Sequence, residues 1–217
     1  MPVLITILLL SYLIGSIPTS VIVARLVKGI DIRQYGSGNA GATNVLRVLG
    51  WKAALPVALF DVFKGTLAVL VFARLRFGDT PLPIDDLTLQ AWAGAAAVVG
   101  HIWPVFARFR GGKGVATTLG VLLGLYPLAA VLFVSIFLLV ALPSGYVSLG
   151  SITAALLIPV ILHLAHIYGW LTVPDPVLRI TVLFAGLILF AHRENVKRLA
   201  TGTENRFGKR RRAKPSE

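Results

Sequence analysis

Apolar residues form long runs along this chain, and polar residues gather in the short segments between them. A run of about 20 apolar residues is long enough to cross the hydrocarbon core of a bilayer as a helix. The pattern therefore predicts an all-α integral membrane protein. The predicted spans cover residues 3–23, 53–73, 89–106, 115–142, 152–164 and 177–191.

The first span contains Gly15 and Pro18, which predict a kinked helix. Basic residues follow this span, beginning with Arg25 and Lys28, and none precedes it. The order is unlike that of a cleavable signal peptide, which starts with a positive region. It predicts that the N-terminus lies outside and that the polar loop of residues 25–52 lies inside.

The longest run, residues 115–142, is interrupted by Tyr126 and Pro127. It forms either one long helix or two helices that turn near Pro127, because proline breaks the intrahelical hydrogen bonds. Basic residues cluster in the first loop, in residues 108–113 and in the tail. If the chain turns at Pro127, all three clusters lie on the cytoplasmic side, whereas one long helix would leave the tail outside. We therefore expect seven helices, with the N-terminus outside and the C-terminus cytoplasmic. Each half of the run is short for a span, so at least one is tilted or begins below the surface.

Composition supports a membrane protein, since 56% of the 217 residues are hydrophobic, 14% are charged and the mean hydropathy is +0.82. We expect one transmembrane domain over residues 1–217, with a basic cytoplasmic tail from about residue 193. The net charge of +12 is concentrated in clusters, which favours anionic lipids and phosphorylated substrates over nucleic acid. The absence of cysteine excludes disulfides, thiolate catalysis and cysteine-based metal sites.

The first polar cluster is the segment of residues 36–47, which follows the first span. Its small polar side chains, glycines and arginine can bring backbone N–H groups, hydroxyls and a guanidinium close to an anion. An ordinary connecting loop is the alternative. A GxGxxG match here is coincidental, because it follows a membrane helix and no βαβ unit is possible. The candidate residues are Ser37, Gly38, Asn39, Gly41, Thr43, Asn44 and Arg47, of which Thr43 and Arg47 share a face if the segment is helical.

The second cluster is Gly-Gly-Lys-Gly at residues 111–114. It is not a Walker loop, because Ala107 stands where that motif needs glycine and Gly114 stands where it needs serine or threonine. It still combines flexible backbone donors, a lysine and a helix that begins at once with Val115. A tight turn at the positive inner face is the alternative. The candidates are Gly111, Gly112, Lys113, Gly114 and Thr117.

The third cluster begins at His192 and Asn195, which face the same way at a spacing of three residues. Arg193 lies elsewhere on the helical wheel, and the arginines at 210–212 are expected to meet lipid phosphates. Asp61 and Lys64 lie in an apolar span, where they either pair with each other or support a site from below. Two further pairs have plainer interpretations: close helix packing for Gly120 and Gly124, and a membrane-interface position for His163 and His166.

Residues 37–47, 100–117 and 192–195 resemble, in order, the three signature motifs of the bacterial acyl-phosphate:glycerol-3-phosphate acyltransferases, the PlsY-type membrane family. The resemblance extends over nearly the whole chain. It implies a multi-pass enzyme of the bacterial cytoplasmic (inner) membrane with its active site at the cytoplasmic face. Such an enzyme transfers a fatty acyl group from acyl phosphate to the sn-1 hydroxyl of glycerol 3-phosphate, giving lysophosphatidic acid and phosphate.

The resemblance also implies roles for individual residues. We expect Ser37, Arg47, Lys113, His192 and Asn195 to be catalytic, and the other candidates, with Ser148 and Arg193, to bind substrate. One departure is Gly145, where the family leads us to expect a basic residue. No cofactor or metal is expected. The expected partners are glycerol 3-phosphate, acyl phosphate, membrane lipids and, as a candidate, an enzyme that produces acyl phosphate.

Acyl phosphate is an activated mixed anhydride, so the reaction does not demand a nucleophilic side chain. Nor does the chain contain the His-x4-Asp pair of another acyltransferase class. The hypothesis is that Ser37, Asn39 and Arg47 hold phosphates together with Lys113, that the glycerol hydroxyl attacks directly, and that the departing phosphate takes the proton. His192 and Asn195 would orient the acceptor. The alternatives are an organic-phosphate transporter, which one-sided clusters and the lack of an apparent inverted repeat disfavour, and a noncatalytic lipid-binding scaffold.

Overall fold

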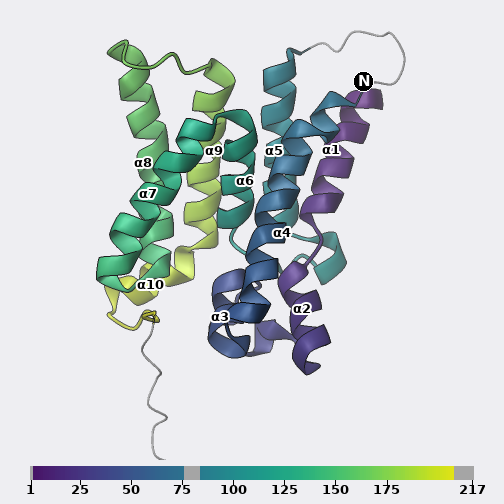
Figure 1. Cartoon of the computed structure of the whole chain (residues 1–217), viewed down its shortest axis with the longest axis vertical. Coiled ribbons are helices and arrows are strands. Elements are labelled where there is room, and N and C mark those ends of the chain that lie inside the picture. Colours follow the sequence, from purple (N-terminus) through teal and green to yellow (C-terminus); the bar gives the residue numbers. More distant parts are fainter. Residues whose placement is uncertain (1, 76–83, 208–217) are drawn as a thin grey trace, which may run out of the picture.

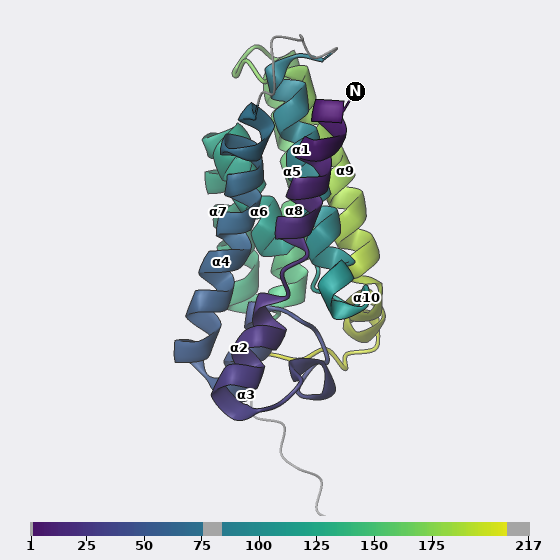
Figure 2. The ribbon, with the colours of Figure 1, turned by 90° about the vertical axis from the view of Figure 1, so that its right-hand side faces the viewer.

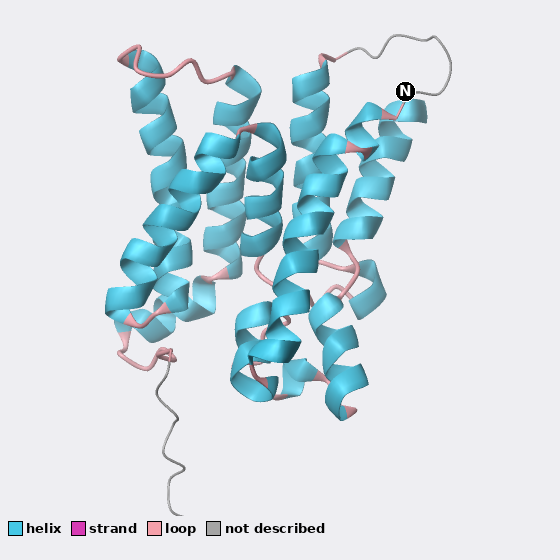
Figure 3. Cartoon of the chain, in the orientation of Figure 1, coloured by secondary structure: helices cyan, strands magenta, loops and turns pink. Residues whose placement is uncertain are grey.

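The computed structural model describes residues 2–75 and 84–207, and the regular structure of this part is entirely helical (Figure 3). The helices run roughly along one axis and form an elongated bundle (Figure 1). Their bounds are α1 Pro2–Gly15, α2 Thr19–Lys28, α3 Ala42–Leu49, α4 Trp51–Leu70, α5 Asp86–Ile102, α6 Val115–Leu125, α7 Pro127–Ser144, α8 Val147–Ile167, α9 Asp175–Ala191 and α10 Arg193–Ala200.

The first predicted span is broken rather than kinked, because α1 ends at Gly15 and α2 begins only at Thr19 (Figure 2). Gly15 packs so closely on α5 that a Cβ atom there would lie 2.2 Å from the Ala97 carbonyl oxygen. Pro18 cannot donate a backbone hydrogen bond, so it cannot continue the ladder of α1. The break leaves the carbonyl oxygen of Ile17 available to a side chain from α4.

The predicted turn at Pro127 is confirmed, since α6 and α7 are separate helices that meet at Tyr126. The backbone of Tyr126 is not helical (φ −154°, ψ 84°), and the α conformation is disfavoured for a residue before a proline. With 11 residues, α6 is about 16 Å long, roughly half the thickness of the hydrocarbon core. The loop before α6 therefore lies deep in the bundle.

Two predicted segments differ from the structure. The segment of residues 25–52 is not all loop, because it contains α3 and a short 3₁₀ turn at Ile32–Gln34. The span predicted for residues 152–164 starts too late, since α8 already begins at Val147. The tail begins with the helix α10, which has eight residues and few apolar ones, so the hydropathy pattern does not indicate a span there. The arginines at 210–212 lie outside the described residues.

Five described segments are long and apolar enough to cross a membrane, and they comprise Pro2–Lys28, Trp51–Arg74, Asp86–Ala107, Pro127–Ser144 and Val147–Ile167. The α9–α10 pair, which bends by 62° between its two helices, raises the number to six if it is counted as one span. Helix α6 is apolar but shorter than this length.

Glycines allow α4 and α6 to touch along their backbones. A Cβ atom at Gly120 would lie 1.9 Å from the Val62 carbonyl oxygen, and one at Gly65 would lie 2.3 Å from the Thr117 carbonyl oxygen. The prediction that Gly120 serves close helix packing is confirmed, and Gly124 packs on the side chain of Val69.

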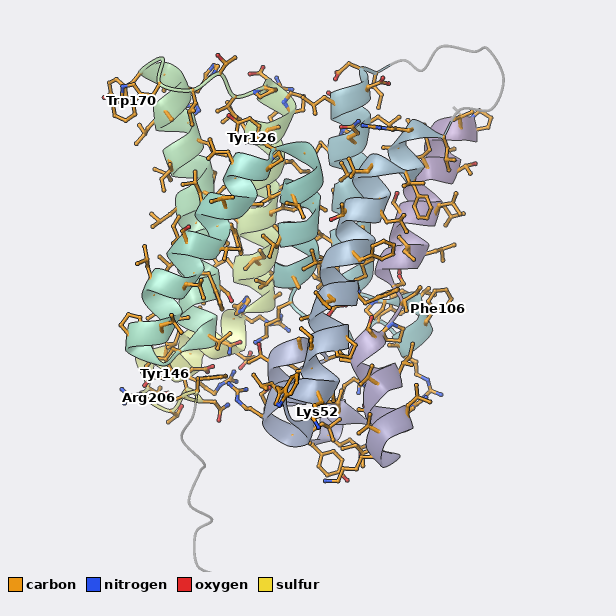
Figure 4. All side chains as sticks on the ribbon, in the orientation of Figure 1. Lys52, Phe106, Tyr126, Tyr146, Trp170 and Arg206 are labelled. Atoms are coloured by element: carbon orange, nitrogen blue, oxygen red, sulfur yellow. The ribbon has the colours of Figure 1, made fainter. Side chains whose placement is uncertain are left out.

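The three polar clusters gather toward one end of the bundle, opposite the N-terminus (Figure 1). Segment 36–47 leads into α3 and α4, loop 111–114 leads into α6, and His192 joins α9 to α10. Trp170 lies at the other end (Figure 4), and its ring stacks on that of Tyr168 with the ring centres 5.4 Å apart. His166, in the same part of the chain, is exposed. The fold thus separates the predicted anion-binding residues from the aromatic loop.

Candidate active site

A pocket of about 330 Å³ opens where the three clusters meet. One side of the pocket is polar and contains the predicted residues Ser37, Asn39, Gly41, Thr43, Asn44, Arg47, Lys113, Ser148, His192 and Asn195. The other side is apolar and is formed by Ala58, Val62, Val115, Ala116, Leu119, Phe133, Val134, Phe137 and Val147. The pocket therefore combines hydrogen-bonding and cationic groups with a surface suited to hydrocarbon.

Asn44 closes the first cluster into a compact loop. Its Oδ1 accepts a hydrogen bond from the Ser37 backbone N–H at 2.8 Å, and its Nδ2 lies within 3.1 Å of the carbonyl oxygens of Ile32, Tyr35 and Asn39. The side chain is buried, and these bonds occupy its donors. Asn44 thus holds Ser37 and Asn39 in place, and because it also lines the pocket, its role in substrate binding stays a prediction.

Glycine is required at position 36 of this loop. Its φ of +64° lies in the left-handed region, and a Cβ atom there would lie 2.3 Å from Asn44 Oδ1. Gly38 also has a positive φ, of +75°, but it does not line the pocket. The two glycines shape the loop around Asn44.

Helix α3 presents Thr43 and Arg47 to the pocket, so the predicted shared face is present. Arg47 is exposed, and its guanidinium makes no hydrogen bond or ion pair with the described residues. An unpaired guanidinium at the rim of a pocket is free to bind a phosphate with two parallel hydrogen bonds.

Loop 111–114 lies directly on His101, which explains its glycines. The Gly112 backbone N–H donates to the His101 carbonyl oxygen at 3.1 Å. A Cβ atom at Gly111 would lie 2.1 Å from that oxygen, and one at Gly112 would lie 2.2 Å from His101 Nε2. Neither glycine lines the pocket, and Gly114, with φ of +82°, caps α6 against Val98 and Ile102. Together they set the position of Lys113.

Among the cationic groups of the pocket, Lys113 has the pKa that burial changes most clearly. Its ammonium donates a hydrogen bond to Asn195 Oδ1. Burial lowers the pKa of Lys113 to about 8, against the opposing effect of nearby Glu204 and with the help of Arg198 and Arg47. The group is therefore mostly charged at neutral pH and lies close to its titration range.

His192 and Asn195 lie where α9 bends into α10, and both are buried. His192 Nδ1 lies 2.8 Å from the Ile188 carbonyl oxygen, which can only accept, so Nδ1 carries a proton. In the neutral ring, Nε2 is then a free acceptor. Asn195 Nδ2 donates to Glu204 Oε1 at 2.8 Å, while its Oδ1 accepts from Lys113.

Glu204 is a pocket residue that the sequence reasoning missed. Its carboxylate accepts hydrogen bonds from Ser148 Oγ at 3.0 Å, Asn195 Nδ2 at 2.8 Å and Arg198 Nε at 2.7 Å. Burial disfavours its charge, but these bonds outweigh burial and hold the pKa of Glu204 below its usual range. The sequence contained one indication of its role, since Glu204 is an acidic residue within a strongly basic tail.

Asp61 and Lys64 pair with each other and also lie beneath the site, so both predicted alternatives hold. Lys64 Nζ lies 2.9 Å from Asp61 Oδ1 and donates to the Ile17 carbonyl oxygen at 3.3 Å. His101 Nδ1 lies 3.6 Å from the same carboxylate oxygen, and Asp61 and His101 both line the pocket. This cluster joins the broken first span to the support of loop 111–114.

Besides the four glycines at positions 38, 111, 112 and 114, two further predicted binding residues do not line the pocket. Thr117 is fully buried on α6, and its hydroxyl has no hydrogen-bond partner among the described residues. Arg193 is exposed, and its guanidinium lies 4.8 Å from the centre of the Phe190 ring. The structure does not bring either side chain to the other candidates.

Gly145 ends α7 with φ of +73°, a conformation that other residues rarely adopt. Its carbonyl oxygen accepts from the Phe207 backbone N–H at 2.7 Å. The neighbouring Arg206 places its guanidinium 5.0 Å from the centre of the Tyr146 ring (Figure 4). A basic group therefore stands near this turn, but it comes from the tail.

A helical bundle with membrane-length apolar segments, and a pocket that is cationic on one side and apolar on the other, defines an integral membrane protein that handles amphiphilic phosphates. Comparison with known families gives the particular class. The chain belongs to the glycerol-3-phosphate acyltransferase family, whose sequence description matches residues 5–202.

Relatives and solved structures agree with this assignment. The glycerol-3-phosphate acyltransferase of Chlorobaculum parvum is 44% identical over 226 residues, covering 94% of this chain and 97% of its own, and that of Chlorobaculum tepidum gives the same values. A crystal structure of PlsY (YgiH), an integral membrane glycerol 3-phosphate acyltransferase, in its glycerol 3-phosphate form has a TM-score of 0.81 and 40% identity, covering 94% of this chain and 96% of its own. Its lysophosphatidic acid form has a TM-score of 0.79 and 39% identity, covering 94% and 95%.

Proposed function

We propose that this protein transfers a fatty acyl group from acyl phosphate to the sn-1 hydroxyl of glycerol 3-phosphate, giving lysophosphatidic acid and phosphate. The observation that carries the proposal is the pocket in which Lys113, Arg47 and hydroxyl groups face an apolar wall. Two phosphorylated substrates, one with a hydrocarbon chain, need this combination of groups. The names of the relatives, which are glycerol-3-phosphate acyltransferases, support it.

The polar side of the pocket would hold the two phosphates. Lys113 supplies a point charge, Arg47 supplies a planar pair of donors, and Ser37 and Asn39 add neutral hydrogen bonds. The apolar side, which includes Leu119 and Phe137, would hold the first part of the acyl chain. The reacting carbonyl then lies at the boundary between the two sides.

The reaction needs no covalent enzyme intermediate. The glycerol hydroxyl oxygen attacks the acyl carbonyl carbon, a new C–O ester bond forms, and the C–O bond to phosphate breaks. The departing phosphate takes the hydroxyl proton, and Lys113 with Arg47 stabilises its charge. His192 Nε2 accepts a hydrogen bond from the glycerol hydroxyl and orients it, while Asn195 and Glu204 hold Lys113 at the leaving phosphate.

We further propose that residues 1–217 form one domain of seven membrane helices in the bacterial inner membrane, with the N-terminus outside. Counting α6 and α9 with the five long segments gives this number. The basic residues of α2, of the turn after α5 and of α10 favour the cytoplasmic side for the pocket. An enzyme that makes acyl phosphate would then deliver the donor from the cytoplasm.

The proposal is tested with purified protein in lipid nanodiscs, supplied with palmitoyl phosphate and glycerol 3-phosphate. We expect equal amounts of lysophosphatidic acid and phosphate, and no product when palmitoyl-CoA replaces palmitoyl phosphate. The Arg47→Gln variant, prepared in parallel, should form product at least 100-fold more slowly. Uptake of glycerol 3-phosphate into vesicles without any product would instead establish a transporter.

A further inference from the structure

A second groove lies on the flank of the bundle, between α2 and the turn that follows α5. Its volume is about 480 Å³, and it shares no lining residue with the candidate active site. Phe106 marks its position on the outer surface (Figure 4). The groove is therefore a separate feature of the molecule.

One end of this groove is apolar. Ile17, Pro18, Val21 and Ile22 line it from the first span, and Phe106 lines it from the opposite side. Ile22 is 42% exposed and Phe106 is 61% exposed, and both belong to segments of membrane length. Exposed side chains of this kind lie at the depth of acyl chains.

The other end of the groove is basic. Arg25 is exposed, and its guanidinium makes no hydrogen bond or ion pair with the described residues. Arg33 is already neutralised by Asp31 at 2.7 Å. A neighbouring polar cleft shares Arg33 and adds Arg108 and Arg110, so the surface keeps an excess of positive charge.

The wall of the groove is held in a specific shape. Arg33 donates to the carbonyl oxygens of Ala107 at 2.9 Å and Arg110 at 3.4 Å, and the Phe109 backbone N–H donates to the Pro104 carbonyl oxygen at 2.8 Å. Arg108 and Phe109 have φ of 55° and 57°, in the left-handed region that costs a residue other than glycine about 1–2 kcal/mol. Surrounding contacts hold this conformation, which keeps Phe106 exposed beside the arginines.

We propose that this groove binds one anionic glycerophospholipid from the leaflet on the side of the basic clusters. The phosphate lies on Arg25, and an acyl chain lies against Ile22 and Phe106. A free phosphate would use only the basic end, and an acidic protein segment would have to enter the membrane to reach the apolar end. A phospholipid contacts both ends, because its phosphate and its acyl chain are joined in one molecule.

Native mass spectrometry of the detergent-purified full chain tests the proposal by titration with phosphatidylglycerol or phosphatidylcholine. We expect one phosphatidylglycerol to bind more tightly than further copies and more tightly than phosphatidylcholine. Arg25→Gln should weaken this first binding event about fivefold, the effect of one basic residue at an anionic membrane surface. Phe106→Ser should weaken it as well.

Lys52→Gln is the matched control, because Lys52 is an exposed basic residue at the start of α4 and lies outside the groove. It should leave the first binding event unchanged. The proposal is overturned if Arg25→Gln and Lys52→Gln behave alike, if the two lipids bind equally, or if inorganic phosphate displaces the lipid. Acyl transfer by Arg25→Gln in detergent should stay within about twofold of wild type, so the proposed reaction and the lipid site are tested separately.

Discussion

Asn44 and Lys113 both lie at the pocket, but their side chains are used in different ways. The Asn44 side chain forms hydrogen bonds with the backbone of Ser37, Ile32, Tyr35 and Asn39. It therefore holds the loop before α3 in shape. Lys113 is bonded only to Asn195 among the described residues, and its ammonium can turn to a phosphate. Residue type alone does not separate these two roles, because both are polar groups in polar segments.

The pH dependence of the reaction should follow Lys113. Its pKa of about 8 means that the phosphate-binding charge is present below this pH and is lost as pH rises through it. We expect kcat/KM for acyl phosphate to fall above about pH 8. Lys113→Arg should move this fall to higher pH, because arginine stays charged, and Lys113→Ala should remove it together with at least 100-fold of activity. An unchanged profile in Lys113→Arg would contradict the assignment.

Replacing Asn44 should affect stability as well as activity. Asn44→Leu removes the hydrogen bonds of Asn44 to the Ser37 backbone N–H and to the carbonyl oxygens of Ile32, Tyr35 and Asn39. The Ile32 and Tyr35 carbonyl oxygens keep a backbone donor, so we expect a total cost of about 1–3 kcal/mol. We expect a lower thermal midpoint in detergent and faster trypsin cleavage near Arg33. Arg47→Gln is the comparison, since Arg47 is exposed and unpaired, and it should lose activity at an unchanged midpoint. Equal midpoints for the two variants would show that Asn44 does not hold the loop.

At the scale of elements, the pocket depends on how closely α6 approaches α4. The short α6 starts deep in the bundle, and loop 111–114 reaches it with Lys113 already beneath the surface. Gly65 and Gly120 make this approach possible, because they remove the side chains that would separate the two backbones. Helix packing thereby controls the burial of Lys113 and, through burial, its pKa.

Gly120→Ala should disrupt this contact strongly. Its Cβ atom would overlap the Val62 carbonyl oxygen, and overpacking of this kind costs about 1–3 kcal/mol or more. Gly186→Ala is the control, since Gly186 lies within α9 with open space around it, and alanine there favours the helix by about 1 kcal/mol. Thermal unfolding in detergent should show a lower midpoint for the first variant and an equal or higher one for the second. The reverse order would refute the close contact.

Much of this architecture could be predicted from the sequence, but not the short elements. Long apolar runs predict membrane helices because a chain in lipid must satisfy its backbone hydrogen bonds internally. Pro127 predicts a turn because proline interrupts the hydrogen bonds of a helix. Helices α3 and α10 have eight residues each, which is too short to be stable without tertiary packing, so their sequences carry little signal. Glu204 joins the pocket only because the chain after α10 folds back over Ser148, a long-range contact that no local pattern indicates.

At the scale of the whole molecule, α2, α3 and α10 lie at the end of the bundle opposite the N-terminus (Figure 1), and their sequences carry many of the basic residues. This asymmetry favours one orientation in the membrane. It also lets water-soluble glycerol 3-phosphate enter from the same side as a donor whose acyl chain remains in the bilayer. A single opening at the membrane surface would then serve both substrates.

The orientation can be tested with single cysteines, because the chain contains none of its own. In spheroplasts, a membrane-impermeant maleimide should label Thr172→Cys in the loop after α8. It should label Gln34→Cys and Thr203→Cys only after the membrane has been opened, since both lie at the pocket end. Labelling of Thr203→Cys in intact spheroplasts would place the pocket on the outer side.

The central claim is that the two phosphates meet in one pocket and that the hydroxyl attacks the acyl phosphate directly. Rapid-quench measurement of a single turnover, with limiting ³²P-labelled acyl phosphate and excess enzyme, tests it most directly. We expect no burst of labelled phosphate without glycerol 3-phosphate, and with it the same rate constant for phosphate release and lysophosphatidic acid formation. A stoichiometric burst of phosphate before glycerol 3-phosphate is added, with acyl groups attached to the protein, would contradict the account.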